Sequence, residues 1–330
     1  MNQNNPINAH WLVMVLLSCV ALLQTGCPQA ASTSLVYNVD NMKEIREEFQ
    51  LGGSGGVAAS AGPAVPPRDN PLWTDVTFKF QVEGEVVQLS PISTPKQKDI
   101  CGAVYANQIF EVSSSGQFKN VLVFLDMSLP SDPASGWVHE QYDFDWVDAN
   151  VTGDKLPQQL REVEFDQEKC VFEHRMFAMR TNQIMKILNS DPVPHNTNMS
   201  PKKNPGANPT VGPNSSVNYT PDKEGENFKA ELAPFAIACS IHPWMLSYGI
   251  FRDNPYFGVT NKNGEVTIQK VPAGVPLKFA VWQESLKWVA PSKVEGATDK
   301  WKRGKFEVTL PEGDSHIITV SIDGSLLKAS

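Results

Sequence analysis

The chain has 330 residues, enough for one large or two modest domains, and its 41% hydrophobic content can supply a packed core. Its formal net charge is -8, and its basic residues form no long run. These features argue against a nucleic-acid surface built on phosphate contacts, and against acidic partners.

The first residues resemble an export signal. The apolar run from Trp11 to Leu23 is too short and too near the terminus for a membrane span. The stretch that ends at Cys27 resembles a bacterial lipoprotein cleavage box, in which the cysteine becomes the lipidated first residue. We therefore expect a signal peptide over 1–26 and lipidation at Cys27. The protein would be exported to the periplasm or cell envelope, with a membrane tether through Cys27.

Residues 27–72 are rich in Gly, Ala and Pro and predict a flexible linker. From residue 73 the pattern changes to period two, since Val76, Phe78, Phe80 and Val82 alternate with polar residues. The further strands that we expect cover 119–126, 170–180, 183–189, 233–239, 248–252, 264–271, 276–284, 305–310 and 316–322. The class is therefore all-β, with one or two sandwiches.

The polar segment 196–228 is full of Asn and Pro, and we expect a surface loop there.

The cysteines bear on the chemistry because exported thiols tend to pair. Of five, Cys19 lies in the signal and Cys27 is the lipid candidate, which leaves Cys101, Cys170 and Cys239. If Cys101 and Cys170 form a disulfide, Cys239 is left over. A lone exported thiol is usually protected by burial or by a metal, and both readings stay open here.

In "AIACSIHPWMLSYG", Cys239, His242 and Met245 fall at intervals of three. A tight loop between strands can point all three side chains at one spot. A thiolate, an imidazole and a thioether favour copper, and a blue-copper site needs one more histidine. His195 is the best candidate, because "NSDPVPHN" places it in a loop just after an apolar strand.

"NSDPVPHN" followed by "CSIHPWM" resembles the cupredoxins, over roughly residues 160–253, and the short ligand loop is most similar to that of amicyanin. The resemblance implies a Greek-key sandwich in which His195, Cys239, His242 and Met245 bind one type 1 copper. It also implies a carrier of single electrons rather than an enzyme.

The resemblance assigns roles to the neighbours of the ligands as well. Asn196 would tie the two ligand loops together by hydrogen bonds. His242 would reach the surface as the electron portal, where a redox partner such as a cytochrome or dehydrogenase docks. Pro243 and Trp244 would form an apolar patch there, although Trp244 could instead cover the copper pocket.

A second resemblance concerns "NPYFGVTNKNGEVTIQKVPAGVPLKFAVWQE", which is similar to carboxypeptidase regulatory-like and related carbohydrate-binding β-sandwiches. It implies a second small sandwich built from residues 73–130 and 254–325. The cupredoxin domain would then be inserted into this sandwich or joined to it, with Cys101 and Cys170 linking the two parts.

Other candidate groups have ordinary structural readings. We expect His174 to be a hydrogen-bonded structural residue, and the strand-end carboxylates Asp126, Asp166 and Asp191 to be solvated turn residues. The sequence has no His-x-His pair, no haem motif and no G-x-S-x-G elbow, so no catalytic constellation is found. The alternatives to electron transfer are copper storage or delivery, and a copper-free sandwich that binds carbohydrate or protein.

Overall fold

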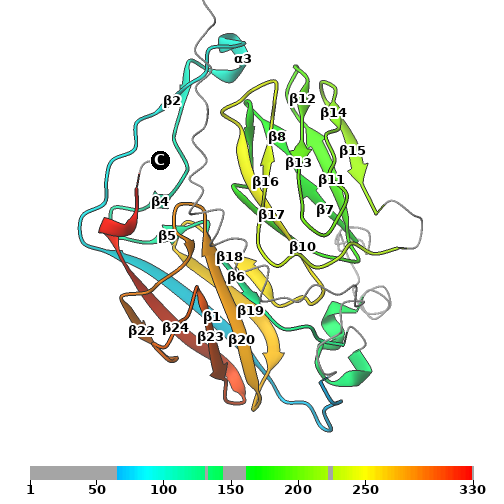
Figure 1. Cartoon of the computed structure of the whole chain (residues 1–330), viewed down its shortest axis with the longest axis vertical. Coiled ribbons are helices and arrows are strands. Elements are labelled where there is room, and N and C mark those ends of the chain that lie inside the picture. The colour runs from blue at the N-terminus through cyan, green and yellow to red at the C-terminus, as the bar shows by residue number, and fades with distance from the viewer. Residues whose placement is uncertain (1–64, 131–132, 144–160, 222–225, 329–330) are drawn as a thin grey trace, which may run out of the picture. The chain divides into compact units, whose positions relative to one another are not determined.

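The computed structural model describes residues 65–130, 133–143, 161–221 and 226–328 (Figure 1). All of them belong to one compact unit, Ala61–Ser330. The predicted signal peptide, Cys27 and most of the predicted linker lie outside the described residues. Within the described ranges, no helix is both long enough and apolar enough to cross a membrane.

Strands from the beginning and the end of the described chain form one β-sandwich, here called the flanking sandwich. Its first sheet has the order β19 (Glu265–Pro272), β1 (Trp73–Glu83), β24 (Gly313–Asp323) and β22 (Lys293–Glu295). Its second sheet joins β18 (Phe257–Val259), β6 (Leu122–Leu125), β20 (Pro276–Gln283) and β21 (Lys287–Trp288), with β23 (Lys305–Thr309) also paired to β20. The two sheets face each other, since the rings of Phe78 and Phe279 lie 5.4 Å apart.

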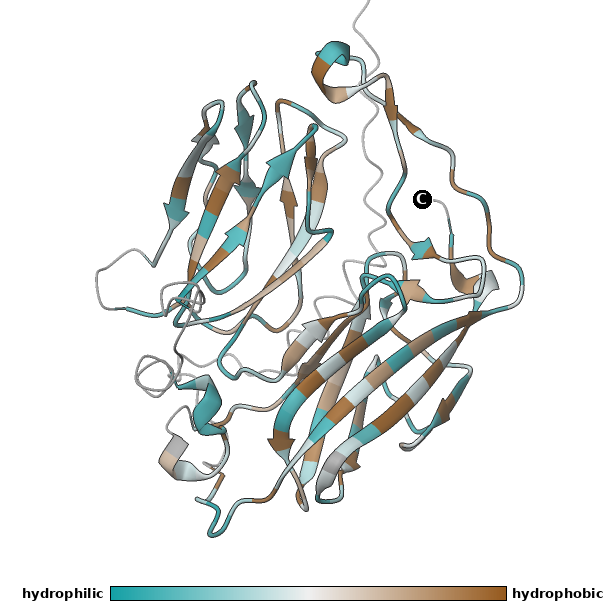
Figure 2. Ribbon diagram, turned by 180° about the vertical axis from the view of Figure 1, so that it is seen from behind, coloured by the Kyte–Doolittle hydropathy of each residue, from teal (hydrophilic) through white to brown (hydrophobic). Residues whose placement is uncertain are grey.

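The predicted alternation in β1 is confirmed. Val76, Phe78, Phe80 and Val82 are buried, and the residues between them are partly exposed. Figure 2 shows the same alternation of hydrophobic and hydrophilic residues along the strands of this sandwich. Burial of the apolar face against the second sheet therefore determines which way β1 faces.

The middle of the chain forms a second set of sheets, here called the central sandwich. One sheet has the order β10 (Met176–Arg180), β17 (Leu246–Arg252), β16 (Phe235–Ala238) and β13 (Asn198–Met199). Another has the order β15 (Ser215–Tyr219), β11 (Ile184–Asn189) and β7 (Glu162–Phe165). Two short pairs accompany them: β12 (His195–Asn196) with β14 (Thr210–Val211), and β8 (Gln167–Glu168) with β9 (Val171–Phe172).

The prediction of a surface loop over 196–228 is wrong, because this segment contains the strands β13, β14 and β15. Its larger apolar side chains are few: Met199, Val211, Tyr219 and Phe228 are buried and Val217 is partly buried, while most of the residues around them are exposed or partly exposed. Backbone pairing can hold such short strands with one anchor each, so no apolar period appears in the sequence. The expected strand 170–180 is also broken into β9 and β10.

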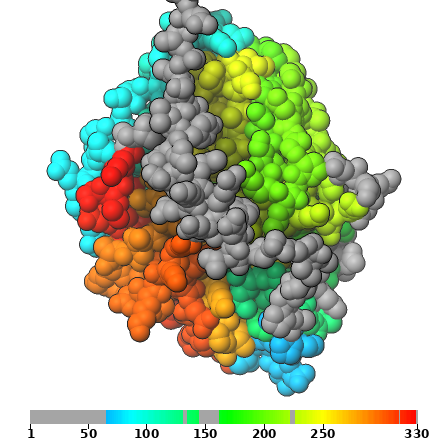
Figure 3. Space-filling view, viewed as in Figure 1, coloured from blue at the N-terminus to red at the C-terminus, as the bar shows by residue number. Residues whose placement is uncertain are grey.

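A segment between β1 and β6, here called the arm, comprises residues 92–105. It contains β2 (Ile92–Ser93), α3 (Lys98–Cys101) and β3 (Val104–Tyr105), and β2 pairs with β3. Cys101 of the arm forms a disulfide with Cys170 of the central sandwich. In Figure 3 the cyan atoms of the arm border the yellow atoms of the central sandwich.

The remaining described elements are short. They are the paired strands β4 (Glu111–Val112) and β5 (Phe118–Lys119) and the 3-10 helices η1 (Pro133–Ser135), η2 (Glu140–Tyr142) and η3 (Gly324–Leu326). The all-β prediction is confirmed.

Candidate metal centre

The loop between β16 and β17 folds back on itself and brings Cys239 and His242 together. Cys239 N donates to Met245 O at 3.2 Å, and Met245 N donates to His242 O at 2.9 Å. The backbone N–H of His242 donates to Cys239 Sγ at 3.4 Å, and His242 Nδ1 lies 3.9 Å from that sulfur. The spacing of three residues thus closes one tight turn, with the thiol and the imidazole on the same side.

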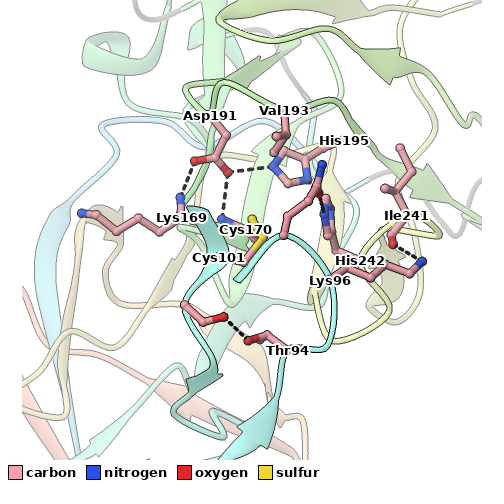
Figure 4. The surroundings of a disulfide bond; sticks show 12 residues. Thr94, Lys96, Cys101, Lys169, Cys170, Asp191, Val193, His195, Ile241 and His242 are labelled. Atoms are coloured by element: carbon pink, nitrogen blue, oxygen red, sulfur yellow. Dashed lines mark hydrogen bonds and ion pairs between the residues drawn. A yellow bond between two sulfur atoms is a disulfide. The ribbon is translucent and has the colours of Figure 1, made fainter. Parts of the chain in front are cut away.

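His195 reaches the same point from β12, which pairs with β14. Its Nδ1 lies 2.8 Å from Nδ1 of His242, although 47 residues separate the two in sequence. Both rings are fully buried. Figure 4 shows the two imidazoles close together, beside the Cys101–Cys170 disulfide.

Each ring is oriented by an acceptor at its other nitrogen. Asp191 Oδ2 lies 2.7 Å from His195 Nε2, and Gln97 Oε1 lies 2.5 Å from His242 Nε2. A carboxylate and an amide oxygen only accept, so each Nε2 carries the proton and each Nδ1 offers a lone pair. Two lone pairs that face each other repel, unless a proton or a cation lies between them.

This donor set fits a metal ion. Bonds of about 2.0 Å from each nitrogen to one ion would hold the two nitrogens roughly 3 Å apart, close to the observed 2.8 Å. His195, Cys239 and His242 place their ligand atoms within 4.8 Å of one another. In the described part of the chain, the other groups of three candidate ligands include Cys101 or Cys170, whose sulfurs are joined in a disulfide, which leaves His195, Cys239 and His242 as the group with a free thiol.

The electrostatics favour a thiolate beside the imidazoles. Burial raises the pKa of Cys239, but hydrogen bonds from His195, Asn196 and the loop backbone outweigh burial and lower it. For His195, burial lowers the pKa, but hydrogen bonds to Cys239 and Asp191 outweigh burial and raise it. For His242, burial and then the charges of His195 and Lys96 lower the pKa to about 4. His242 is therefore held neutral, as a metal ligand must be.

Asn196 joins the two ligand segments. Its Oδ1 accepts from the backbone N–H groups of Ser240 at 2.8 Å and Ile241 at 3.2 Å, and lies 3.4 Å from Cys239 Sγ. Its Nδ2 donates to Asn208 Oδ1 at 2.5 Å. The side chain next to His195 thus fixes the loop that carries Cys239.

Met245 is buried in the same apolar cluster as Cys239 and Trp244. The indole N–H of Trp244 donates to Cys170 O at 3.0 Å, and its ring lies 5.1 Å from that of His242. Of the two roles considered for Trp244, this placement favours covering the pocket, whereas Pro243 is exposed.

Two expectations from the sequence are wrong. His242 does not reach the surface, because Gln97 of the arm lies against its Nε2 edge. Asp191 is not a solvated turn residue, since it is 3% exposed and also accepts from the backbone N–H groups of Lys169 and Cys170 (Figure 4). The spacing of four residues between Asp191 and His195 could have suggested their pairing.

No sequence pattern could have suggested the contact between Gln97 and His242, because 145 residues separate them in the chain. The other histidines of the described residues lie elsewhere. His139 accepts from Gln141 N at the start of η2, and His316 contacts Gly296 O at 2.7 Å. The ring of His174 stacks on Phe165 at 6.5 Å.

A β-sandwich with a Cys–His–Met loop opposite a second histidine resembles the cupredoxin class. No protein-family model and no curated protein matches the chain.

Among solved structures, amicyanin from Paracoccus versutus is 16% identical, with 32% of this chain and 87% of that chain covered and a TM-score of 0.22. The P52G mutant of amicyanin is 14% identical, with 32% and 88% covered and a TM-score of 0.23. A copper-containing nitrite reductase from Thermus scotoductus SA-01 is 17% identical, with 27% and 22% covered and a TM-score of 0.22.

Proposed function

We propose that this protein binds one type 1 copper ion through His195, Cys239, His242 and Met245, and that it carries single electrons. The observation that supports this most strongly is the pair of imidazoles whose Nδ1 atoms face each other at 2.8 Å beside a thiol with a lowered pKa. A cation at this position would relieve the repulsion between the two lone pairs and neutralise the thiolate.

Copper bound there supplies a one-electron couple between Cu(II) and Cu(I). The chain's own residues hold the ligands in place. Asp191 and Gln97 orient the two rings, and Asn196 ties the loop of Cys239 to the strand of His195. Because these groups are hydrogen-bonded and buried, the ligands have little freedom to move when the charge at the site changes.

The surroundings of the site keep water out. The candidate ligands are at most 2% exposed, and Trp244 packs beside His242. A site with four protein ligands and no solvent access leaves no open position for a substrate, which favours electron transfer over substrate chemistry. The same closure favours retention of copper over storage or delivery, since delivery requires ready exchange.

The setting of this function is also part of the proposal. An export signal with lipidation at Cys27 would place the protein in the cell envelope, tethered to the membrane by residues 27–72. A redox protein such as a cytochrome or dehydrogenase would exchange electrons with it.

The test is a titration of the purified full chain with Cu(II), followed by visible absorption. We expect an intense thiolate-to-copper band in the wild type and none in Cys239→Ser. His316→Gln is the matched control, because this histidine lies on β24 of the flanking sandwich, where its ring contacts Gly296 O, and it should keep the band. Absence of the band in the wild type would contradict the proposal.

A further inference from the structure

Gln97 separates the loop histidine of the candidate site from solvent. Its Oε1 lies 2.5 Å from His242 Nε2. Gln97 is itself exposed, whereas His242 is 0% exposed. The Nε2 edge of the His242 ring is therefore occupied by a side chain of the arm.

Two contacts hold the arm on either side of His242. Lys96 Nζ donates to Ile241 O at 2.8 Å, and Tyr105 Oη donates to Trp244 O at 2.5 Å (Figure 4 shows the first). Both acceptors belong to the ligand loop.

Covalent and apolar contacts reinforce this attachment. The Cys101–Cys170 disulfide joins the arm to the central sandwich, and Ile92, Ile100 and Tyr105 pack against its apolar cluster. The arm is thus fixed by covalent, polar and apolar contacts around one ring.

The local structure of the arm leaves the Gln97 side chain free for this contact. Gln97 is the N-cap residue of α3, but its side chain makes no capping hydrogen bond. Its backbone is left-handed, with φ 47°, and its carbonyl accepts from the N–H groups of Ile100 and Cys101. The left-handed region is uncommon for residues other than glycine, so surrounding contacts must hold Gln97 there.

We propose that Gln97 is a positioning residue of the copper site and that the arm is a built-in cover for His242. This inference rests on the proposed function. By accepting from Nε2–H, Gln97 keeps the proton on that nitrogen and leaves Nδ1 free for the metal. The cover also closes the site against outside ligands, so a redox partner meets the arm rather than the imidazole.

Gln97→Asn tests the positioning role. Asn keeps the amide and tolerates the left-handed backbone, but it is one methylene shorter and does not reach His242. In the metal-free full chain, we expect the His242 Nε2–H to exchange with solvent about tenfold faster, the factor that corresponds to one lost hydrogen bond. Nitrogen-15 NMR of the ring measures this rate, and Gln97→Glu should restore protection because it keeps an acceptor of the original length.

Gln88→Ala is the matched control, since Gln88 is another exposed glutamine of the same part of the chain. It should leave the exchange rate unchanged. Equal exchange rates in the wild type and Gln97→Asn would overturn the positioning role.

The cover is tested through Cys239, whose Sγ lies 3.9 Å from His242 Nδ1 and which is 2% exposed. The double variant Cys101→Ser/Cys170→Ser removes the disulfide that joins the arm to the central sandwich, and it leaves no new thiols. We expect Cys239 in the metal-free chain to be alkylated at least about tenfold faster, because loss of the cross-link lowers the free-energy cost of opening the arm. Mass spectrometry of the Cys239 peptide follows the reaction, and circular dichroism checks that the variant is folded.

An unchanged alkylation rate in the folded double variant would contradict the proposal that the arm covers His242. Because both readouts use the metal-free protein, they are independent of the copper titration. Absence of the copper band in the wild type would contradict the proposed function. A normal band together with an unaltered exchange rate of the His242 Nε2–H in Gln97→Asn would contradict only this inference.

In the copper-loaded chain, Gln97→Asn should speed the loss of copper to a chelator. Loss of a group that orients a ligand typically costs about 10- to 100-fold in metal affinity. Gln97→Glu should retain copper as the wild type does, and loss at the wild-type rate from Gln97→Asn would contradict the role of Gln97.

Discussion

The two sandwiches bury different kinds of side chain. In the flanking sandwich, β1 and β20 meet through apolar rings, and Phe78, Phe279 and Phe306 lie within 6.3 Å of one another. The central sandwich buries two histidines, with Asp191 and Asn196 beside them, next to a free thiol. Buried polar groups destabilise a fold unless they are hydrogen-bonded. The contrast indicates that apolar ring packing holds the centre of the flanking sandwich, whereas the central sandwich also accommodates a hydrogen-bonded group of buried polar side chains.

Phe279→Ala should have the largest effect on stability. Phe279 is 0% exposed in β20, and its truncation should lower the free energy of unfolding by about 3–5 kcal/mol. Denaturant titration of the metal-free chain measures this, and Ile317→Ala, at a position 51% exposed, is the control with little loss. If the folded variant also lost the copper band, the two sandwiches would not differ in role as we describe.

Asp191→Asn tests the role of the buried polar groups in the central sandwich. The amide cannot accept from His195 and the two backbone N–H groups as the carboxylate does, so the ring loses its preferred orientation. We expect copper affinity to fall by about 10- to 100-fold, measured by competition with a chelator. Asp299→Asn, an exposed change in the flanking part, should leave the affinity unchanged, and an unaltered affinity in Asp191→Asn would refute the orienting role.

Lys79→Ala should have the smallest effect. Lys79 and Glu265 form an ion pair at 2.8 Å on the outer face of the flanking sandwich, with side chains 43% and 37% exposed. Exposed pairs contribute about 0.2–1 kcal/mol, so the midpoint of unfolding should barely move. A loss comparable to that of Phe279→Ala would show that stability in this sandwich does not come mainly from its apolar core.

Some elements of this fold can be predicted from their own residues, and others cannot. Period-two patterns located β1 and β19, because a strand with one buried face records that face in its own residues. The polar segment that contains β13, β14 and β15 shows no such pattern, since its strands are held by backbone pairing and single apolar anchors. The sequence also identified the loop of Cys239, His242 and Met245, but not the burial of His242.

What the sequence alone determined was local: the alternation that makes the chain all-β, and the spacing that turns Cys239 and His242 toward each other. Tertiary structure alone decided which groups surround them. Asp191 is buried because the backbone N–H groups of Lys169 and Cys170 need an acceptor. Gln97 reaches His242 because a disulfide and the pairing of β2 with β3 carry the arm across 145 residues of sequence. Contacts between such distant residues leave no periodic trace in the chain, so only the folded structure shows that the loop histidine is covered.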